Sequence, residues 1–270
     1  ISTDIEFNTL KLLDGSISNS MKLDATNATN IVDVEAMNDN LKVGDYKINI
    51  TKATITPAID DDDDTGISNT VALATGAKLA MGSYTLKVVE GTNPDEYVLT
   101  LYDARGIRVG DSVTQTIDPD GADVTVTVGG IEFTWGDGST VDEGDVQLSI
   151  TAEEIEGSVA APDGTKIADI DLDDYTSSYL NVGGLKITFD STLATGTTTA
   201  TFASKAVSFQ IGANEGQYTK LSINNMSSKA LGVDGIDLTT ADSASKAITT
   251  IDEAIQKVSA ERAKLGAIQN

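Results

Sequence analysis

The last 40 residues of the chain, LGVDGIDLTTADSASKAITTIDEAIQKVSAERAKLGAIQN at 231–270, contain its clearest structural pattern. Apolar side chains recur there at alternating spacings of four and three: Ala244, Ile248, Ile251, Ile255, Val258 and Leu265. Such spacing has the 3.5-residue period of a coiled-coil seam. Arg262 takes the one position of the series that lacks an apolar residue. We therefore predict a helix over about 241–268, roughly 40 Å long.

This helix has no partner of comparable length in the sequence. Its N-terminus has several candidate capping residues, namely Thr239, Thr240, Asp242 and Ser243. A helix that lies on its own domain usually has a wider apolar stripe than this seam. We therefore expect the seam to be poorly covered within the chain, or covered only by the short segment 1–42, and to pack against a helix outside it. Arg262 then either reaches solvent or, as we favour, meets a carboxylate on the partner.

The composition excludes several classes of function. Acidic residues outnumber basic ones 42 to 18, which gives a net charge of −24 and a pI near 4.1. Nucleic acid and anionic membranes are therefore not expected partners. The chain has neither Cys nor His, so disulfides, Ser-His-Asp triads and Cys/His zinc sites are excluded. Because the sequence begins at Ile1, without a signal-peptide pattern, we expect a trimmed or processed piece of a longer protein.

The middle of the chain, 43–204, alternates apolar and polar residues between Gly, Asp and Asn turns. This pattern is typical of strands with one buried face. The predicted strands are Tyr46 to Ile55, Ser83 to Glu90, Tyr97 to Tyr102, Asp123 to Val128, Ile131 to Trp135, Asp145 to Ile150, Leu185 to Asp190 and Thr197 to Phe202. Outside this region we predict a short helix over Asp33 to Leu41 and a hairpin of Val207 to Ile211 with Tyr218 to Ile223.

The predicted fold class is therefore α+β. Residues 43–204 form an antiparallel β insertion domain, and 1–42 with 205–270 form an interrupted domain with one hairpin and the long helix. Two stretches of the insertion resemble each other, VGGIEFT at 128–134 and VGGLKIT at 182–188. They indicate either two similar hairpins or a chance likeness between Gly-rich turns.

The sequence offers only weak signals for a catalytic or metal-binding site. The acidic run 60–64 does not have the spacing of a calcium-binding loop, and neither do Asp169, Asp171 and Asp173, so we interpret both as solvated. Trp135, the single tryptophan, is expected to pack in the core and not to serve as a sugar platform. We predict no catalytic residue, no cofactor and no metal ligand.

Three motifs resemble bacterial flagellin, and they occur in flagellin order. They are FNTLKLLDGS at 7–16, FQIGANEGQ at 209–217 and the C-terminal segment at 231–270. In some flagellins the QIGAN-type hairpin precedes the variable insertion, whereas here it follows. The resemblance covers about 80 residues, and the β insertion carries no specific match.

The resemblance implies a secreted, extracellular subunit of the flagellar filament that assembles with other flagellin subunits through its helical part. The β domain would be the exposed, hypervariable part. The seam partner would be the long N-terminal helices of flagellins, which are absent here. The predicted partner-binding residues are accordingly Ile248, Ile251, Ile255, Val258, Arg262 and Leu265.

Other functions remain open from sequence alone. One is a flagellin-like module whose insertion binds a carbohydrate or a cation, and another is an enzyme that uses carboxylate chemistry. Flagellins are also recognised by an innate immune receptor of animals. Because only one helix of that surface is present, we expect weak receptor activation.

Overall fold

The computed structural model describes residues 6–7, 10–11, 13–37, 41–62, 65–118, 121–136 and 141–269. Its strands are β1 (Glu6–Phe7), β2 (Leu10–Lys11), β3 (Ser20–Leu23), β4 (Asp33–Ala36), β5 (Gly44–Asp62), β6 (Ile67–Leu73), β7 (Gly82–Glu90), β8 (Glu96–Asp103), β9 (Val113–Thr116), β10 (Val124–Val128), β11 (Ile131–Trp135), β12 (Gly144–Ala160), β13 (Lys166–Tyr175), β14 (Tyr179–Val182), β15 (Leu185–Thr188), β16 (Gly196–Ala203), β17 (Val207–Gln210) and β18 (Tyr218–Leu221). The helices are α1 (Ser228–Leu231) and α2 (Ala241–Gln269).

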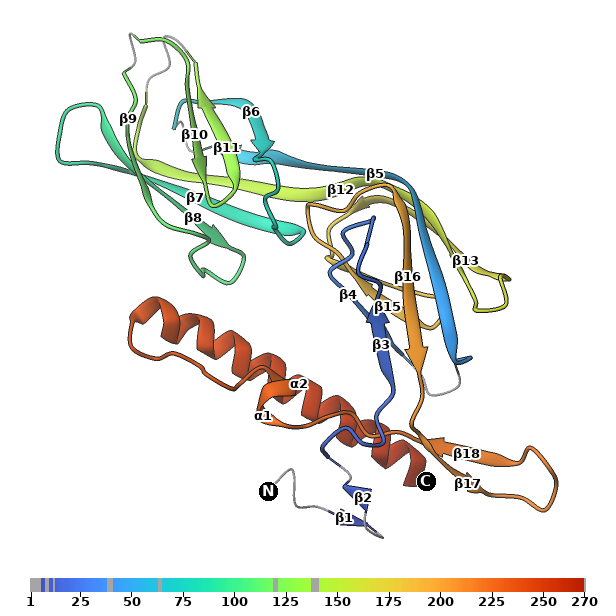
Figure 1. Cartoon of the computed structure of the whole chain (residues 1–270). Helices are drawn as coiled ribbons and strands as arrows, with labels where there is room; N and C mark the ends of the chain where they lie inside the picture. Colours follow the sequence, from blue (N-terminus) through green and yellow to red (C-terminus); the bar gives the residue numbers. More distant parts are fainter. Residues whose placement is uncertain are drawn as a thin grey trace.

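Two long antiparallel strands, β5 and β12, run through the whole β region and join its two lobes (Figure 1). At one end β5 pairs with β16 and β12 pairs with β13. At the other end β12 pairs with β7, which continues to β8 and β9. We call the first end lobe A; it also contains β3, β4, β14 and β15. The second end is lobe B, which also contains β6, β10 and β11.

The two lobes have the same topology. Lobe A has the strand order β16-β5-β12-β13 beside a three-stranded sheet, β14-β15-β4. Lobe B has the order β12-β7-β8-β9 beside β10-β11-β6. All of these pairs are antiparallel, and strands in equivalent places follow the same order along the chain. Lobe B thus repeats the strand topology of lobe A and is inserted in the chain between β5 and β12.

Matching residues support this duplication. Gly44 and Gly82 begin β5 and β7 with φ of 134° and 125°, values that favour glycine. Two residues later stand Tyr46 and Tyr84, whose hydroxyls each donate to the carbonyl four residues back, at 3.0 and 2.8 Å. The sequence around the first tyrosine is VGDYKINI at 43–50, and around the second it is MGSYTLKV at 81–88.

The hairpins predicted from the two VGG motifs are also present in equivalent places. Gly129–Gly130 and Gly183–Gly184 each form a two-residue turn with positive φ at both positions, between β10 and β11 and between β14 and β15. This is the type I′ geometry that suits the twist of a hairpin. The prediction of two similar hairpins is therefore confirmed, and the likeness extends to whole lobes.

One hydrophobic core runs through both lobes. Inward side chains alternate with outward ones along each strand, as in β7, where Tyr84, Leu86 and Val88 are buried. Trp135 is 1% exposed and donates from Nε1 to the Thr65 carbonyl at 3.2 Å, which confirms its predicted core role. Polar groups in the core are paired: the Thr29 and Thr198 hydroxyls lie 2.6 Å apart.

Several expectations about secondary structure were wrong. The stretch 33–36 forms β4 and not the start of a helix, because Val34 is buried on β15 while Asp33 and Glu35 stay exposed. The remainder of that predicted helix, at 38–40, lies outside the described residues. Strands β3, β6, β9 and β13 were missed, and β14 was not among the predicted ranges although it belongs to the second VGG hairpin. Both β3 and β4 fall within 1–42, yet they pair with β16 and β15.

The described residues thus form a mainly antiparallel β structure with one long C-terminal helix. The finer division into domains at residues 42 and 204 stays a prediction. The predicted hairpin is present as β17 and β18, paired from Val207 with Leu221 to Gln210 with Tyr218. No helix among the described residues has the length and apolar character needed to cross a bilayer.

Candidate subunit interface

Helix α2 extends from Ala241 to Gln269, close to its predicted bounds. Its start is fixed by a reciprocal pair of hydrogen bonds. The Ser243 N–H donates to Thr240 Oγ1 at 3.1 Å, and the Thr240 N–H donates to Ser243 Oγ at 3.0 Å. This arrangement is a capping box, so Thr240 is the N-cap among the four predicted candidates.

One face of α2 is covered by the chain segment that precedes it. Ala247 and Ala254 are buried, and Glu261 continues the same row at a spacing of seven. Asn224 contacts Glu261, while a Cβ added to Gly232 would lie 4.0 Å from Thr250 Cγ2. The segment 224–240 therefore returns antiparallel along the helix, as Figure 1 also shows. Small alanine side chains permit this close approach.

A buried polar network holds the C-terminal half of α2 in place. Glu261 is 6% exposed and accepts from the Asn224 backbone N–H at 3.3 Å and from its Nδ2 at 2.9 Å. Lys264 Nζ donates to the Ser222 carbonyl at 3.0 Å and to its Oγ at 2.8 Å, and approaches Glu261 at 3.9 Å. Asn19 Nδ2 also donates to Ser222 Oγ. Charged groups paired in this way tolerate burial.

The predicted seam lies on a different face of α2 and is largely exposed. The exposed fractions are 71% for Ile248, 44% for Ile251, 57% for Ile255 and 37% for Val258. Arg262 is also exposed, whereas Leu265 and Ala244 are half-buried. At about 100° per residue the seam is centred roughly 70° from the Ala247–Ala254 face. The expectation that the seam is poorly covered is confirmed, and its role in partner binding stays a prediction.

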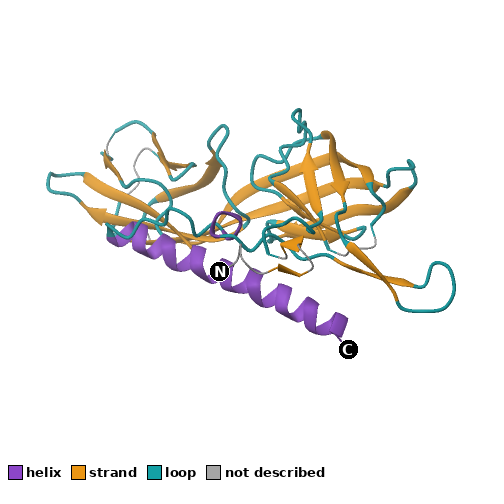
Figure 2. Ribbon diagram, turned by 60° about the horizontal axis from the view of Figure 1, so that its bottom comes forward, coloured by secondary structure: helices purple, strands orange, loops and turns teal. Residues whose placement is uncertain are grey.

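A third side of α2, roughly opposite to the seam, faces lobe B. Arg105, in the β8–β9 turn, lies 3.8 Å from Glu253. Both side chains are more than half exposed, so this ion pair contributes little stability. Figure 2 shows the helix running alongside the β lobes.

The hairpin of β17 and β18 exposes further apolar side chains, which the sequence did not indicate, with Phe209 and Ile211 on one face and Tyr218 on the other. Phe209 is 44% exposed, Ile211 71% and Tyr218 50%. The hairpin projects from the base of the β lobes near the C-terminal end of α2 (Figure 1). The alternation of Val207, Phe209 and Ile211 was the available signal, but alternation alone does not show which face a sheet leaves uncovered.

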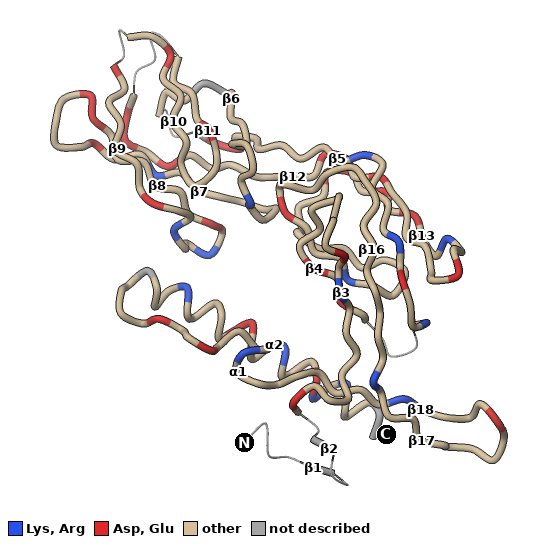
Figure 3. The backbone as a smooth tube through the Cα atoms, viewed as in Figure 1, with Lys and Arg blue, Asp and Glu red and all other residues tan. Residues whose placement is uncertain are grey.

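Charge is divided unequally between the two parts of the chain. Residues 1–204 contain 35 acidic and 11 basic residues, whereas 205–270 contain seven of each. The entire net charge of −24 therefore lies in the part that contains the β lobes (Figure 3). One surface ion pair there joins Lys42 to Asp163, and the 2.7 Å hydrogen bond from the Lys42 ammonium holds the pKa of Asp163 well below its usual value.

The acidic stretches lie on strands of the β lobes where the structure describes them. No group of three or more Asp or Glu side chains in the described residues is placed to hold an ion. Asp169, Asp171 and Asp173 lie exposed along one side of β13. Part of the acidic run 60–64 is within β5, and Asp60 accepts from the Ser149 hydroxyl at 3.0 Å.

Curated proteins with sequence similarity to the chain are flagellar. A putative flagellin of Bacillus subtilis (strain 168) is 52% identical over 66 residues, 23% of this chain and 40% of that protein. Flagellin FlaB1 of Treponema pallidum (strain Nichols) is 46% identical over 68 residues, 23% of this chain and 24% of that protein. The flagellar filament 33 kDa core protein of Treponema phagedenis is 43% identical over 68 residues, with the same two shares.

These matches confirm the resemblance to flagellins, over about a quarter of the chain. They span less than half the length of each relative. No family model matches the chain. A solved structure of the flagellar cap protein FliD D2-D3 domains from Escherichia coli is 12% identical, covering 69% of this chain and 100% of that one. Its TM-score of 0.24 is too low to support a common fold.

Proposed function

We propose that this flagellin-related chain is a structural subunit of a bacterial flagellar filament, outside the cell, and that it has no catalytic role. The observation that carries the proposal is the exposed seam of α2. Four large apolar side chains on one helix face are unusual on the surface of an isolated soluble protein. Their 3-4 spacing suits another helix and not a sheet or a small ligand.

Burial of this seam supplies the attraction between helices. Fully burying one large apolar side chain contributes about 1.5–3 kcal/mol, and four such residues are available. Arg262 would pair with a carboxylate of the partner at the edge of the contact, while Leu265 extends the seam. Repetition of a heterologous contact that does not close produces a helical filament from one kind of subunit.

The division of charge fits this role. Helices in a filament lie close together, so a neutral assembly segment avoids repulsion between neighbouring subunits. The β lobes carry the acidic excess and would face solvent, where charge limits sticking between filaments. In this proposal 205–270, with the start of the chain, forms the assembly domain, and the β lobes form the outer domain.

The hairpin of β17 and β18 would add a second contact between subunits. Phe209, Ile211 and Tyr218 are exposed within the same neutral segment as the seam. Recognition by the innate immune receptor remains a separate expectation. The chain offers one helix of that surface, so we still expect weak activation.

Incorporation into growing filaments tests the proposal. The fluorescently labelled chain is mixed with purified bacterial flagellin monomers, and its content in sedimented filaments is measured and checked by electron microscopy. We expect incorporation of the unmodified chain and at least a tenfold loss for the double variant Ile251→Ser/Ile255→Ser. Ile167→Ser is the matched control, because Ile167 on β13 is 40% exposed but lies outside the seam.

The proposal predicts that Ile167→Ser incorporates like the unmodified chain. Equal losses for the control and the seam variant would show general stickiness and contradict a specific seam. Failure of the unmodified chain to enter filaments would contradict assembly through α2. Thermal unfolding of both variants checks that the exposed serines leave the fold intact.

A further inference from the structure

The β lobes and the segment 204–270 share no hydrophobic core among the described residues. The core that runs through both lobes consists of side chains between Met21 and Phe202, including those only partly buried at its edge. Four further apolar side chains are buried outside this core: Ile17, Ile223, Ala247 and Ala254. Parts of a chain that have separate cores and a small mutual interface are expected to move relative to one another.

The lobes are joined to the C-terminal segment at one place. The chain enters the lobes at Ser20, on β3, and leaves them at Ala203, on β16, and these two residues pair with each other. Just before β3 the chain is already bound to the other part, since the Met226 N–H donates to the Leu13 carbonyl at 2.9 Å. The two connections therefore lie side by side, near the C-terminal half of α2 (Figure 1). This geometry is that of a hinge.

A second contact lies far from this hinge, where the turn after β8 approaches the first half of α2. Arg105 in this turn is 3.8 Å from Glu253, and both side chains are more than half exposed. The turn and the helix do not pack closely. A cleft of about 140 Å³ lies between them, with Tyr102 and Ile107 on one side and Ser245 on the other. It has room for several water molecules, since each takes roughly 30 Å³ in the liquid.

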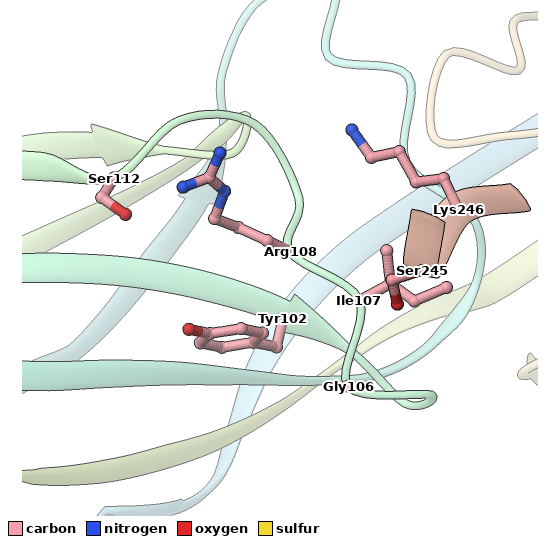
Figure 4. A pocket seen from close by; sticks show the side chains of 7 residues that line it. All are labelled: Tyr102, Gly106, Ile107, Arg108, Ser112, Ser245 and Lys246. Atoms are coloured by element: carbon pink, nitrogen blue, oxygen red, sulfur yellow. The ribbon is translucent and has the colours of Figure 1, made fainter. Parts of the chain in front are cut away.

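The charge of the turn suits this contact. Lobe B belongs to the acidic part of the chain, yet two of the three arginines of the sequence, Arg105 and Arg108, lie in this turn. Figure 4 shows the guanidinium of Arg108 directed away from α2, so Arg105 is the arginine that reaches the helix. Arg105 thus gives an acidic lobe a point of attraction to the carboxylate of Glu253.

We propose that the ion pair of Arg105 with Glu253 is a salt-sensitive latch, which holds the β lobes against α2 and releases them to rotate about the hinge at Ser20 and Ala203. An exposed ion pair is weak, and dissolved salt screens it further, so the docked and the open arrangement are close in free energy. No described member of the hydrophobic core has to be exposed on opening, because none belongs to α2.

This conformational change goes beyond filament assembly and does not depend on it, because it takes place within one chain. Lobe B lies on the side of α2 roughly opposite to the seam, so the seam is exposed in both arrangements. In the docked arrangement the lobes run alongside the helix, and in the open one they point away from it. The ionic strength, and not packing, then determines the angle between the two parts.

Distance measurements between two spin labels test the latch, and the absence of cysteine from the sequence lets each label be placed by one substitution. The first pair is Thr114→Cys on β9 with Ser259→Cys on α2, and both residues are exposed. The second pair, Thr114→Cys with Thr51→Cys on β5, lies within the lobes and is the rigid reference. Between about 20 mM and about 1 M NaCl, we expect the fraction with a long first distance to rise about two- to fivefold. The reference distance should stay constant.

Variants of the ion pair separate the latch from a general effect of salt. Arg105→Gln should show at low salt the open fraction that the unmodified chain shows at high salt. Arg108→Gln, the matched control, removes the same charge from the same turn and should leave the distances unchanged. The exchanged pair Arg105→Glu/Glu253→Arg should restore the docked distance at low salt.

Three results would overturn the latch. They are a single first distance under all conditions, equal behaviour of Arg105→Gln and Arg108→Gln, and failure of the exchanged pair to dock. Thermal unfolding of each variant checks that the substitutions leave both parts folded, so that a changed distance reports movement and not loss of structure.

Discussion

The β lobes and the segment 205–270 are constructed in opposite ways. The lobes contain nearly all of the buried apolar side chains, carry nearly all of the net charge, and bury the inward face of their long strands. The C-terminal segment is electrically neutral and leaves its largest apolar side chains exposed on α2 and the hairpin. The lobes thus bury their apolar surfaces within the chain, whereas the C-terminal segment leaves its seam exposed, as the proposed assembly requires.

This difference predicts which substitutions lower the stability of the chain and which do not. Side chains in a self-contained core are constrained by their neighbours within the chain, and their loss lowers stability. Side chains on the seam are exposed in this chain, so in the proposed assembly their loss should affect incorporation into filaments and not stability.

Leu148→Ala should produce the largest loss of stability. Leu148 is fully buried on β12, in lobe B. Deleting its branched end lowers the free energy of unfolding by about 2–5 kcal/mol through lost burial and a cavity. Urea denaturation measures the change. Ile255→Ala, the matched change on the seam, should stay within about 0.5 kcal/mol of the unmodified chain. Similar losses for both would contradict the division.

Gly129→Ala should lower the free energy of unfolding more than the equivalent change Gly183→Ala, although both glycines have φ of 59°. A Cβ at Gly129 would lie 2.7 Å from Leu101 Cδ2 and from the Val109 carbonyl, whereas at Gly183 the nearest atom is Ile167 Cγ2 at 3.1 Å. We expect losses of about 2–3 and about 1–2 kcal/mol, respectively. Thermal unfolding of the two variants ranks them. The reverse order would mean that the duplicated hairpins are packed differently from this description.

Tyr84 should make the stability of lobe B depend on pH under alkaline conditions. Burial raises the pKa of its hydroxyl from 10.0 to about 12. Because the folded form holds the proton more tightly, this stabilisation is complete below pH 10. It is lost as the pH rises to about 12, by roughly 2 kcal/mol. Urea denaturation between pH 8 and 11.5 should show this slope, reduced in Tyr84→Phe. An unchanged slope in that variant would exclude Tyr84 as its source.

Glu261→Ala should have a smaller and local effect. It removes the buried acceptor of both Asn224 groups and costs about 1–2 kcal/mol where 222–224 docks on α2. Hydrogen exchange should therefore become faster in the C-terminal half of the helix and remain unchanged in the lobes. Glu261→Gln keeps an acceptor oxygen and should retain most of the protection. Faster exchange throughout the molecule would show that the two parts are more strongly coupled than we describe.

The sequence predicted the long helix best. The 3-4 spacing of Ile248, Ile251 and Ile255, with a nearby cap, is a local signal that needs no knowledge of distant contacts. The same spacing identified the face of α2 that the structure leaves exposed. Hairpins such as β10–β11 were also predictable, since the VGG motif contains both the turn and its flanking strands.

Elements that depend on distant partners were not predictable. Strand β4 has the polar sequence DVEA, and only its pairing with β15, some 150 residues away, determines its conformation. Strand β13 alternates Asp with apolar residues beside β12, which resembles an acidic loop in isolation. The contact of Arg105 with Glu253 depends on the packing of lobe B against α2, for which no local motif exists.

The pairing of Ser20 with Ala203 places the entry and exit of the β lobes side by side at one end of antiparallel strands β3 and β16. Lobe B likewise enters and leaves lobe A through β5 and β12. Each inserted part is therefore attached to two neighbouring antiparallel strand ends. Because these ends lie side by side, either a short turn or a complete domain can connect them. The chain can lengthen outward by successive insertions without moving any residue of the part beneath, and it can be shortened at the same points.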